Sequence, residues 1–181
     1  MPTRDDYLAM PLAGRLARLA RLPGELAASI ADRSDAELSR RAPDGWSAKE
    51  IVCHLRDIEE LTMLRYHTML VMDDPKVFVV GTPPPDAEAW GITGDVPFPL
   101  DPERWSEERQ YQRNDTPLAL EAFRRRRNEA LAFFAALTPE QLERGSIHPE
   151  RGRVTFAEWT AGIASHDDNH LEQLRRALGD V

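Results

Sequence analysis

The stretch SAKEIVCHLRDIEELTMLRYHTMLVM at residues 47–72 predicts the longest helix of the chain, and with it the fold. Ser47 is followed three residues later by Glu50, the capping-box pattern that starts a helix at Ala48. Apolar residues then recur three and four positions apart as far as Met72, with no proline or glycine between them. A helix of roughly 25 residues is about 37 Å long, which suits a helical bundle.

Three other segments carry the same helical spacing. The first spans residues 12–30, where Pro23 followed by glycine predicts a kink or a break. The others begin near Thr116 and Thr155, and the last ends at Leu178 before a glycine that stops the helix. Four long helices therefore predict a bundle.

The segment between the second and third long helices is different. Residues 73–105 hold seven prolines and three glycines, which excludes a long helix and favours a loop that covers a functional site. Residues 77–80 could form a short strand, and short helical pieces are expected at 34–40 and from Thr138. With no convincing sheet, we predict an all-α fold: one four-helix-bundle domain over residues 1–181, with a long loop between helices two and three.

Composition narrows the class of partner. The 181 residues include 31 acidic and 23 basic side chains, a net charge of −8 that repels nucleic acids and anionic membranes. No stretch approaches the roughly 18 consecutive apolar residues of a membrane span. The single cysteine, Cys53, excludes a disulfide framework, so we expect a cytoplasmic protein. The arginine run at 124–127 is interpreted as a solvated helix face.

The histidines carry the functional signal. His166 and His170 are four residues apart, so both imidazoles leave the same face of the last helix. His54 shares its face of the second helix with core residues, and three converging neutral imidazoles are most easily satisfied by a metal ion. His67 lies roughly 220° around the helix from His54 and is expected at the surface. His148 lies in a turn with no partner at metal spacing.

Other interpretations of these residues remain open. A core histidine is commonly a hydrogen-bonded structural residue, so a bundle without metal is the simplest alternative. The pair also recurs in zinc-protease helices of the HExxH type, but Asp167 stands where that motif needs glutamate, which makes a peptidase improbable. Cys53 points about 100° away from His54 and is interpreted as a small buried apolar group.

Two stretches resemble a known family. Residues 45–59 (GWSAKEIVCHLRDIE) and 159–174 (WTAGIASHDDNHLEQL) are similar to the DinB/YfiT-like superfamily of metalloenzymes, and the resemblance extends along the whole chain. It implies a four-helix bundle with a three-histidine site for a divalent transition metal such as zinc, nickel or iron. Carried over by position, the implied metal ligands are His54, His166 and His170. The residues implied to order ligands or water beside them are Asp57, Glu59 and Gln173.

The resemblance also suggests an activity. Characterised members use the metal to activate a low-molecular-weight thiol, so the first expectation is a thiol S-transferase acting on a small-molecule substrate. A metal-dependent hydrolase is the alternative enzyme, and a non-catalytic metal-binding or small-ligand-binding stress protein is the alternative outside catalysis. A homodimer is expected from resemblance alone. Arg65 and the loop around Trp90 are candidates for a polar pocket that would hold the thiol.

Overall fold

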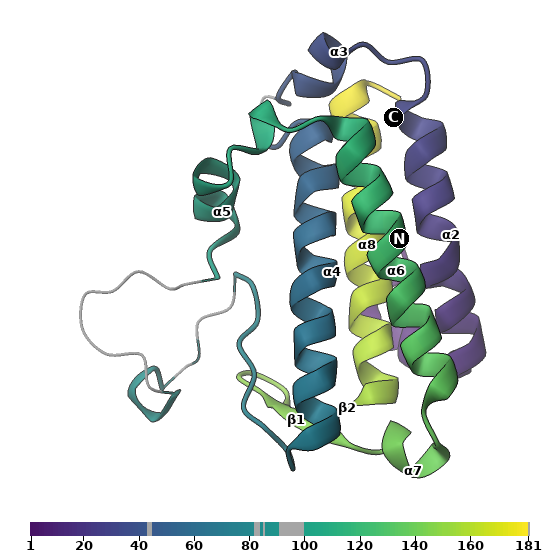
Figure 1. The fold of residues 1–181 in the computed structure, drawn as a ribbon, viewed down its shortest axis with the longest axis vertical. Coiled ribbons are helices and arrows are strands. Elements are labelled where there is room, and N and C mark those ends of the chain that lie inside the picture. The colour runs from purple at the N-terminus through teal and green to yellow at the C-terminus, as the bar shows by residue number, and fades with distance from the viewer. Residues whose placement is uncertain (43–44, 82–83, 85, 91–99, 181) are drawn as a thin grey trace.

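A computed structural model describes residues 1–42, 45–81, 84, 86–90 and 100–180 (Figure 1). Four long helices lie side by side: α2 (Leu12–Ile30), α4 (Ala48–Val71), α6 (Thr116–Ala136) and α8 (Phe156–Leu178). Their main contacts run in the cyclic order α2, α6, α4 and α8, so α4 and α8 are neighbours although about a hundred residues separate them. The predicted four-helix bundle is confirmed.

The ends of the long helices follow local sequence signals. The Oγ of Ser47 accepts a hydrogen bond from the backbone of Glu50, whose carboxylate accepts one from the Ser47 backbone, which completes the capping box of α4. Thr155 and Glu158 do the same for α8. Gly179 ends α8 in the left-handed conformation at φ 77°, where glycine carries no steric penalty.

The sequence predicted a kink or a break at Pro23, and the structure shows that the helix is not broken there. Helix α2 continues through it from Leu12 to Ile30. The apolar residues on both sides of the proline, including Leu19, Leu22 and Leu26, are buried against the neighbouring helices. This packing outweighs the loss of one backbone hydrogen bond.

Short elements connect the long ones and close the ends of the bundle. They are α1 (Arg4–Leu8), α3 (Asp35–Ser39), η1 (Glu88–Trp90), α5 (Pro102–Glu108), η2 (Tyr111–Arg113) and α7 (Pro139–Leu142). Helix α1 was not predicted, although Thr3 and Asp6 form a capping box that marks its start. No helix in the described ranges is both long and apolar enough to cross a membrane.

A small hairpin adds to the predicted all-helical fold. Strand β1 (Gly145–His148) pairs antiparallel with β2 (Gly152–Thr155), in the register Ser146 opposite Val154. The segment proposed as a strand at 77–80 is not a regular strand; Lys76, directly before it, forms a parallel bridge with Ile147. Strands of four residues are too short for alternation to be recognised in a sequence.

A buried ion-pair network crosses the bundle core. Arg127 of α6 is 1% exposed, and its guanidinium donates to Glu59 of α4 at 2.7 and 2.8 Å and to Asp167 of α8 at 2.6 Å. The interpretation of 124–127 as a solvated face is therefore wrong for Arg127. It belongs to the core-facing stripe of α6 with Phe123 and Ala130, and two carboxylates offset its buried charge.

Candidate metal centre

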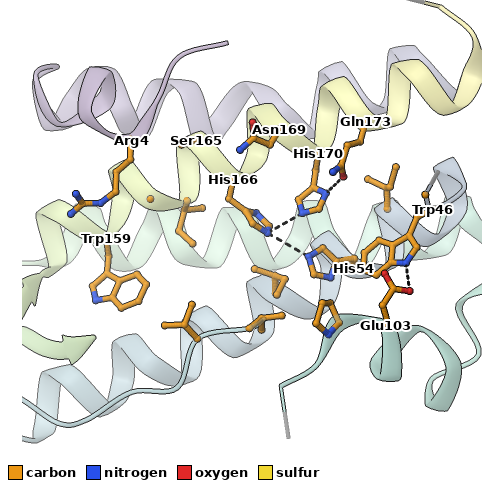
Figure 2. A pocket seen from close by; sticks show the side chains of 18 of the residues that line it. Arg4, Trp46, His54, Glu103, Trp159, Ser165, His166, Asn169, His170 and Gln173 are labelled. Atoms are coloured by element: carbon orange, nitrogen blue, oxygen red, sulfur yellow. Dashed lines mark hydrogen bonds between the residues drawn. The ribbon is translucent and has the colours of Figure 1, made fainter. Parts of the chain in front are cut away.

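The three histidines meet where α4 and α8 pack together. His54 lies in the first half of α4, whereas His166 and His170 lie one turn apart in α8. The His166 Nε2 atom is 3.4 Å from Nε2 of His54 and 3.1 Å from Nε2 of His170 (Figure 2). All three ligand atoms lie within 4.8 Å of one another, so the fold brings together the three residues that the sequence singled out.

The spacing of these nitrogens suits a divalent ion. Metal–nitrogen bonds of about 2.0–2.1 Å at a tetrahedral angle separate two nitrogens by about 3.3 Å. The two Nε2 separations of 3.4 and 3.1 Å lie close to that value. The Nδ1 atoms of His54 and His166 are buried without a hydrogen-bond partner in the described part of the chain. An ion would not change the surroundings of these Nδ1 atoms, but it would give the three converging Nε2 lone pairs a common partner, which hydrogen bonds among neutral imidazoles cannot do for all three.

The protonation states also favour ligation. Burial, followed by repulsion from His170 and His166, holds the pKa of His54 well below its usual value. Burial and His166 lower the pKa of His170 to about 3. Both rings are therefore neutral at physiological pH, the form in which imidazole binds a metal.

Gln173 fixes the tautomer of one ring. Its Oε1 lies 2.7 Å from Nδ1 of His170. The amide carbonyl therefore accepts a hydrogen bond from Nδ1–H, and the lone pair of Nε2 is directed at the other two histidines. The position implied for Gln173 beside the ligands thus has a direct contact with one of them.

The two carboxylates implied beside the site lie elsewhere. Asp57 accepts hydrogen bonds from Arg56, Arg109 and the hydroxyl of Tyr111, and its described contacts do not reach the three histidines.

Glu59 approaches the site only indirectly. It binds Arg127, which binds Asp167, and Asp167 Oδ1 lies 3.9 Å from Nδ1 of His166. That distance is too long for a hydrogen bond. Burial alone would raise the pKa of Asp167, but Arg127 outweighs it, so the carboxylate stays charged beside the imidazole.

Trp46 is a site residue that the sequence interpretation did not assign. Its ring stacks on His170 with an interplanar angle of 9° and meets the edge of His54 at a centroid distance of 4.9 Å. The indole Nε1 donates to Glu103 of α5 at 3.0 Å, which links the loop region to the site (Figure 2). Its place directly before the cap of α4, eight residues or about two turns from His54, was the available signal.

A cavity of about 680 Å³ adjoins the histidines and is partly open to solvent. The side chain of His166 retains 30% of its exposure, so a small molecule can approach the site from solvent. The size is typical of a small-molecule pocket. Trp159, Gly162, Ser165 and Asn169 line the cavity from the same helix as His166.

The other candidates behave mostly as predicted. His67 is exposed and meets Phe133 edge to face. His148 is buried, with its ring facing the backbone of the turn that follows it and Arg151. Cys53 is fully buried, and burial raises the pKa of its thiol to about 11, which suits an inert apolar role. Arg65 does line the cavity, whereas the side chain of Trp90 and residues 91–99 lie outside the described residues.

Comparison with known proteins places the chain in a family. A family model described as the DinB superfamily matches residues 18–174. Protein OB0413 of Oceanobacillus iheyensis, named as a candidate metal-dependent hydrolase, is 25% identical over 156 residues, which cover 86% of this chain and 78% of that protein. YfiT of Bacillus subtilis, named in the same way, is 22% identical over 166 residues, covering 89% of this chain and 82% of YfiT.

A solved structure of YfiT, described as having an unusual four-helix bundle topology, superposes with a TM-score of 0.73 at 20% identity. The alignment covers 93% of this chain and 87% of YfiT, so the two proteins share a fold. With the family model matching most of its length, this chain belongs to the DinB superfamily.

Proposed function

We propose that the protein is a metal-dependent hydrolase in which His54, His166 and His170 hold a divalent transition metal such as zinc, nickel or iron. The observation that carries this proposal is the meeting of three imidazole nitrogens beside a partly open cavity. Three protein ligands leave coordination positions free, as in reactive rather than structural sites. The names of the two relatives point to the same reaction class.

The chain's own residues supply binding and orientation. When bound, a divalent ion supplies Lewis-acid chemistry that makes water, or a thiol, a nucleophile near neutral pH. Gln173 holds the His170 ring in the ligating tautomer, and Trp46 packs against the rings of His54 and His170. Ile58 and Trp159 give the cavity an apolar part of its lining.

Thiol S-transfer is the second candidate, because the cavity is basic. Four arginines line it, namely Arg4, Arg65, Arg151 and Arg176, in a protein whose net charge is −8. Guanidinium groups suit the carboxylates that low-molecular-weight thiols commonly carry. The basic lining supports anionic substrates in general, so it does not separate the two reactions.

One assay pair distinguishes the proposals. The purified protein is incubated with a panel of ester, amide and phosphoester substrates, and separately with low-molecular-weight thiols and an alkylating electrophile. The hydrolase proposal predicts turnover of at least one member of the hydrolysis panel, lost with a chelator and in His166→Ala but retained in His67→Ala. Metal-dependent thiol conjugation without hydrolysis would support the second candidate. Stoichiometric metal with neither activity would support a binding protein instead.

A further inference from the structure

Arg65 is a buried cation with no acidic partner among the described residues. Only 7% of the residue is exposed. Its Nη2 donates to the carbonyl of Phe78 at 2.5 Å, its guanidinium lies 5.6 Å from the ring centroid of Trp159, and its Nε has no hydrogen-bond partner among the described residues. Burial lowers the pKa of Arg65 to about 10, which still leaves it charged at neutral pH.

Of the other three buried arginines in the described part of the chain, Arg127 and Arg18 are paired with carboxylates, whereas Arg15 donates to the carbonyl of Ala157 and is influenced by the charge of Glu158. Arg127 binds both Glu59 and Asp167, and Arg18 binds Asp168 and lies 2.8 Å from Glu25. An unpaired buried charge is strongly destabilising in most proteins, so the burial of Arg65 without a neighbouring carboxylate suggests that a partner from outside the chain binds it.

Two further cations gather at the same end of the cavity. Arg4 and Arg151 line it as Arg65 does. The pKa of His148 is lowered to about 4, first by burial and then by the charges of Arg151, Arg65 and Arg4, so all three guanidinium groups act on one imidazole. The carboxylate nearest to Arg4 is Asp5, at 3.8 Å on a 91% exposed side chain, and such a pair neutralises little charge.

The acidic residue of the cavity lies at the opposite end. Glu103 is the one carboxylate among the described lining residues, and it is held by the indole of Trp46. Figure 2 shows Trp46 and Glu103 on one side of the histidines and Trp159 with Arg4 on the other. The cavity therefore has a basic end, where Arg65 and Trp159 meet, and a histidine end.

The two ends are separated by a definite length. Arg65 is eleven residues after His54 on α4, which returns to within about 20° of the same face at roughly 16 Å along the axis. Trp159 is seven residues before His166 on α8, or about 10 Å. Gly162 lies between Trp159 and His166 in α8 and lines the same cavity, and a Cβ there would meet no atom within 4 Å, so the cavity has free space at this position.

We propose that Arg65, assisted by Arg4 and Arg151, binds an anionic group of the substrate, a carboxylate or a phosphate, while the group that reacts lies at the three histidines. This inference rests on the proposed function for the histidine end and adds the substrate class: a small elongated anion with an apolar middle. The ring of Trp159 offers that middle a flat surface, and the guanidinium of Arg65 provides donors for the oxyanion.

The test is a binding measurement that does not depend on turnover. Isothermal titration calorimetry of the purified protein uses three probes with the same six-carbon chain: hexanoate, hexyl phosphate and hexanol. We expect one of the two anions to bind at least tenfold more tightly than hexanol, and the preferred anion identifies the group. Replacement of Arg65→Met should remove this preference, whereas Arg65→Lys should retain part of it.

Controls separate this site from the metal and from folding. Arg125→Met removes an exposed arginine of α6 and should leave anion affinity unchanged. Arg151→Gln, at an exposed side chain, should weaken anion binding severalfold and tests the basic end even if Arg65→Met does not fold. His166→Ala should lose metal yet keep the preference that depends on Arg65.

Three results would overturn the proposal. They are equal binding of anion and hexanol by the unmodified protein, an unchanged preference in Arg65→Met, and loss of the preference in His166→Ala, which would place the anion at the metal. Absence of metal from the unmodified protein would contradict the proposed function alone, because anion binding at Arg65 is measured independently of it.

Discussion

The Nδ1 atom of His170 lies 2.7 Å from Oε1 of Gln173, three residues later on the same helix. This contact assigns the proton of the ring to the side facing away from His54 and His166. Gln173, which is not itself a metal ligand, would thus control whether the Nε2 atom of His170 can bind a metal.

Replacement of Gln173 by Leu should weaken metal binding about 10–100-fold, because the His170 ring loses the acceptor that fixes its tautomer. Competition with a chelating indicator measures this affinity. Glu172→Leu, on the same helix turn, is the matched control and should bind metal as the unmodified protein does. Equal affinities in both variants would assign Gln173 no role at the site.

Replacement of Arg127 by Met should destabilise the fold by about 3–5 kcal/mol, because Glu59 and Asp167 are left buried without a counter-charge. Denaturant unfolding measures the loss. Arg125→Met removes an exposed arginine of the same helix and should change stability by less than about 0.5 kcal/mol. Similar losses in both variants would contradict the buried network.

The lowered pKa of Glu50 predicts how the stability of the fold depends on pH. Burial opposes its ionisation, but hydrogen bonds from Arg41 and Ser47 outweigh burial and lower its pKa to about 2. Because the folded pKa is below the unfolded value of 4.5, the contribution is fully present above pH 4.5 and is lost as the pH falls towards 2.

The replacement Glu50→Gln isolates this contribution. It should lower stability by about 2 kcal/mol at pH 7. The difference from the unmodified protein should shrink below pH 4.5 in urea titrations at several pH values. A difference that stays constant from pH 7 to pH 3 would contradict the assignment.

Removal of the metal should lower thermal stability, because an ion that binds only the folded state stabilises it by mass action. An ion present at a thousand times its dissociation constant contributes about 4 kcal/mol, and each kcal/mol shifts the melting temperature of a chain of this size by about 2–4 °C. Calorimetry with and without chelator checks this. His166→Ala should show no such shift, and identical shifts in the two proteins would indicate that the chelator acts elsewhere.

The sequence predicted those features that local signals encode. Helices α4 and α8 begin at the predicted residues because Ser47 and Thr155 form capping boxes within four residues of chain. The spacing of His166 and His170 is likewise local. That His54 joins them depends on which faces of α4 and α8 pack together; its position on the core-facing side of the helix suggested this, and the family resemblance added to that prediction.

Features that depend on tertiary packing were missed. Arg127 belongs to a run of four arginines that is typical of a solvated surface, and only the positions of Glu59 and Asp167 on other helices make its burial possible. Trp46 and Arg4 reach the cavity from segments far from α8 in the sequence. Helix α2 likewise continues through Pro23 because it packs against neighbouring helices, and the local sequence around Pro23 does not reveal that packing.

The most direct test of the central claim is elemental analysis of three purified proteins: the unmodified chain, His166→Ala and His67→Ala. The account predicts close to one divalent ion per chain in the unmodified protein and in His67→Ala, and almost none in His166→Ala. Absence of metal from all three, or equal metal content in the two variants, would contradict a metal site formed by His54, His166 and His170.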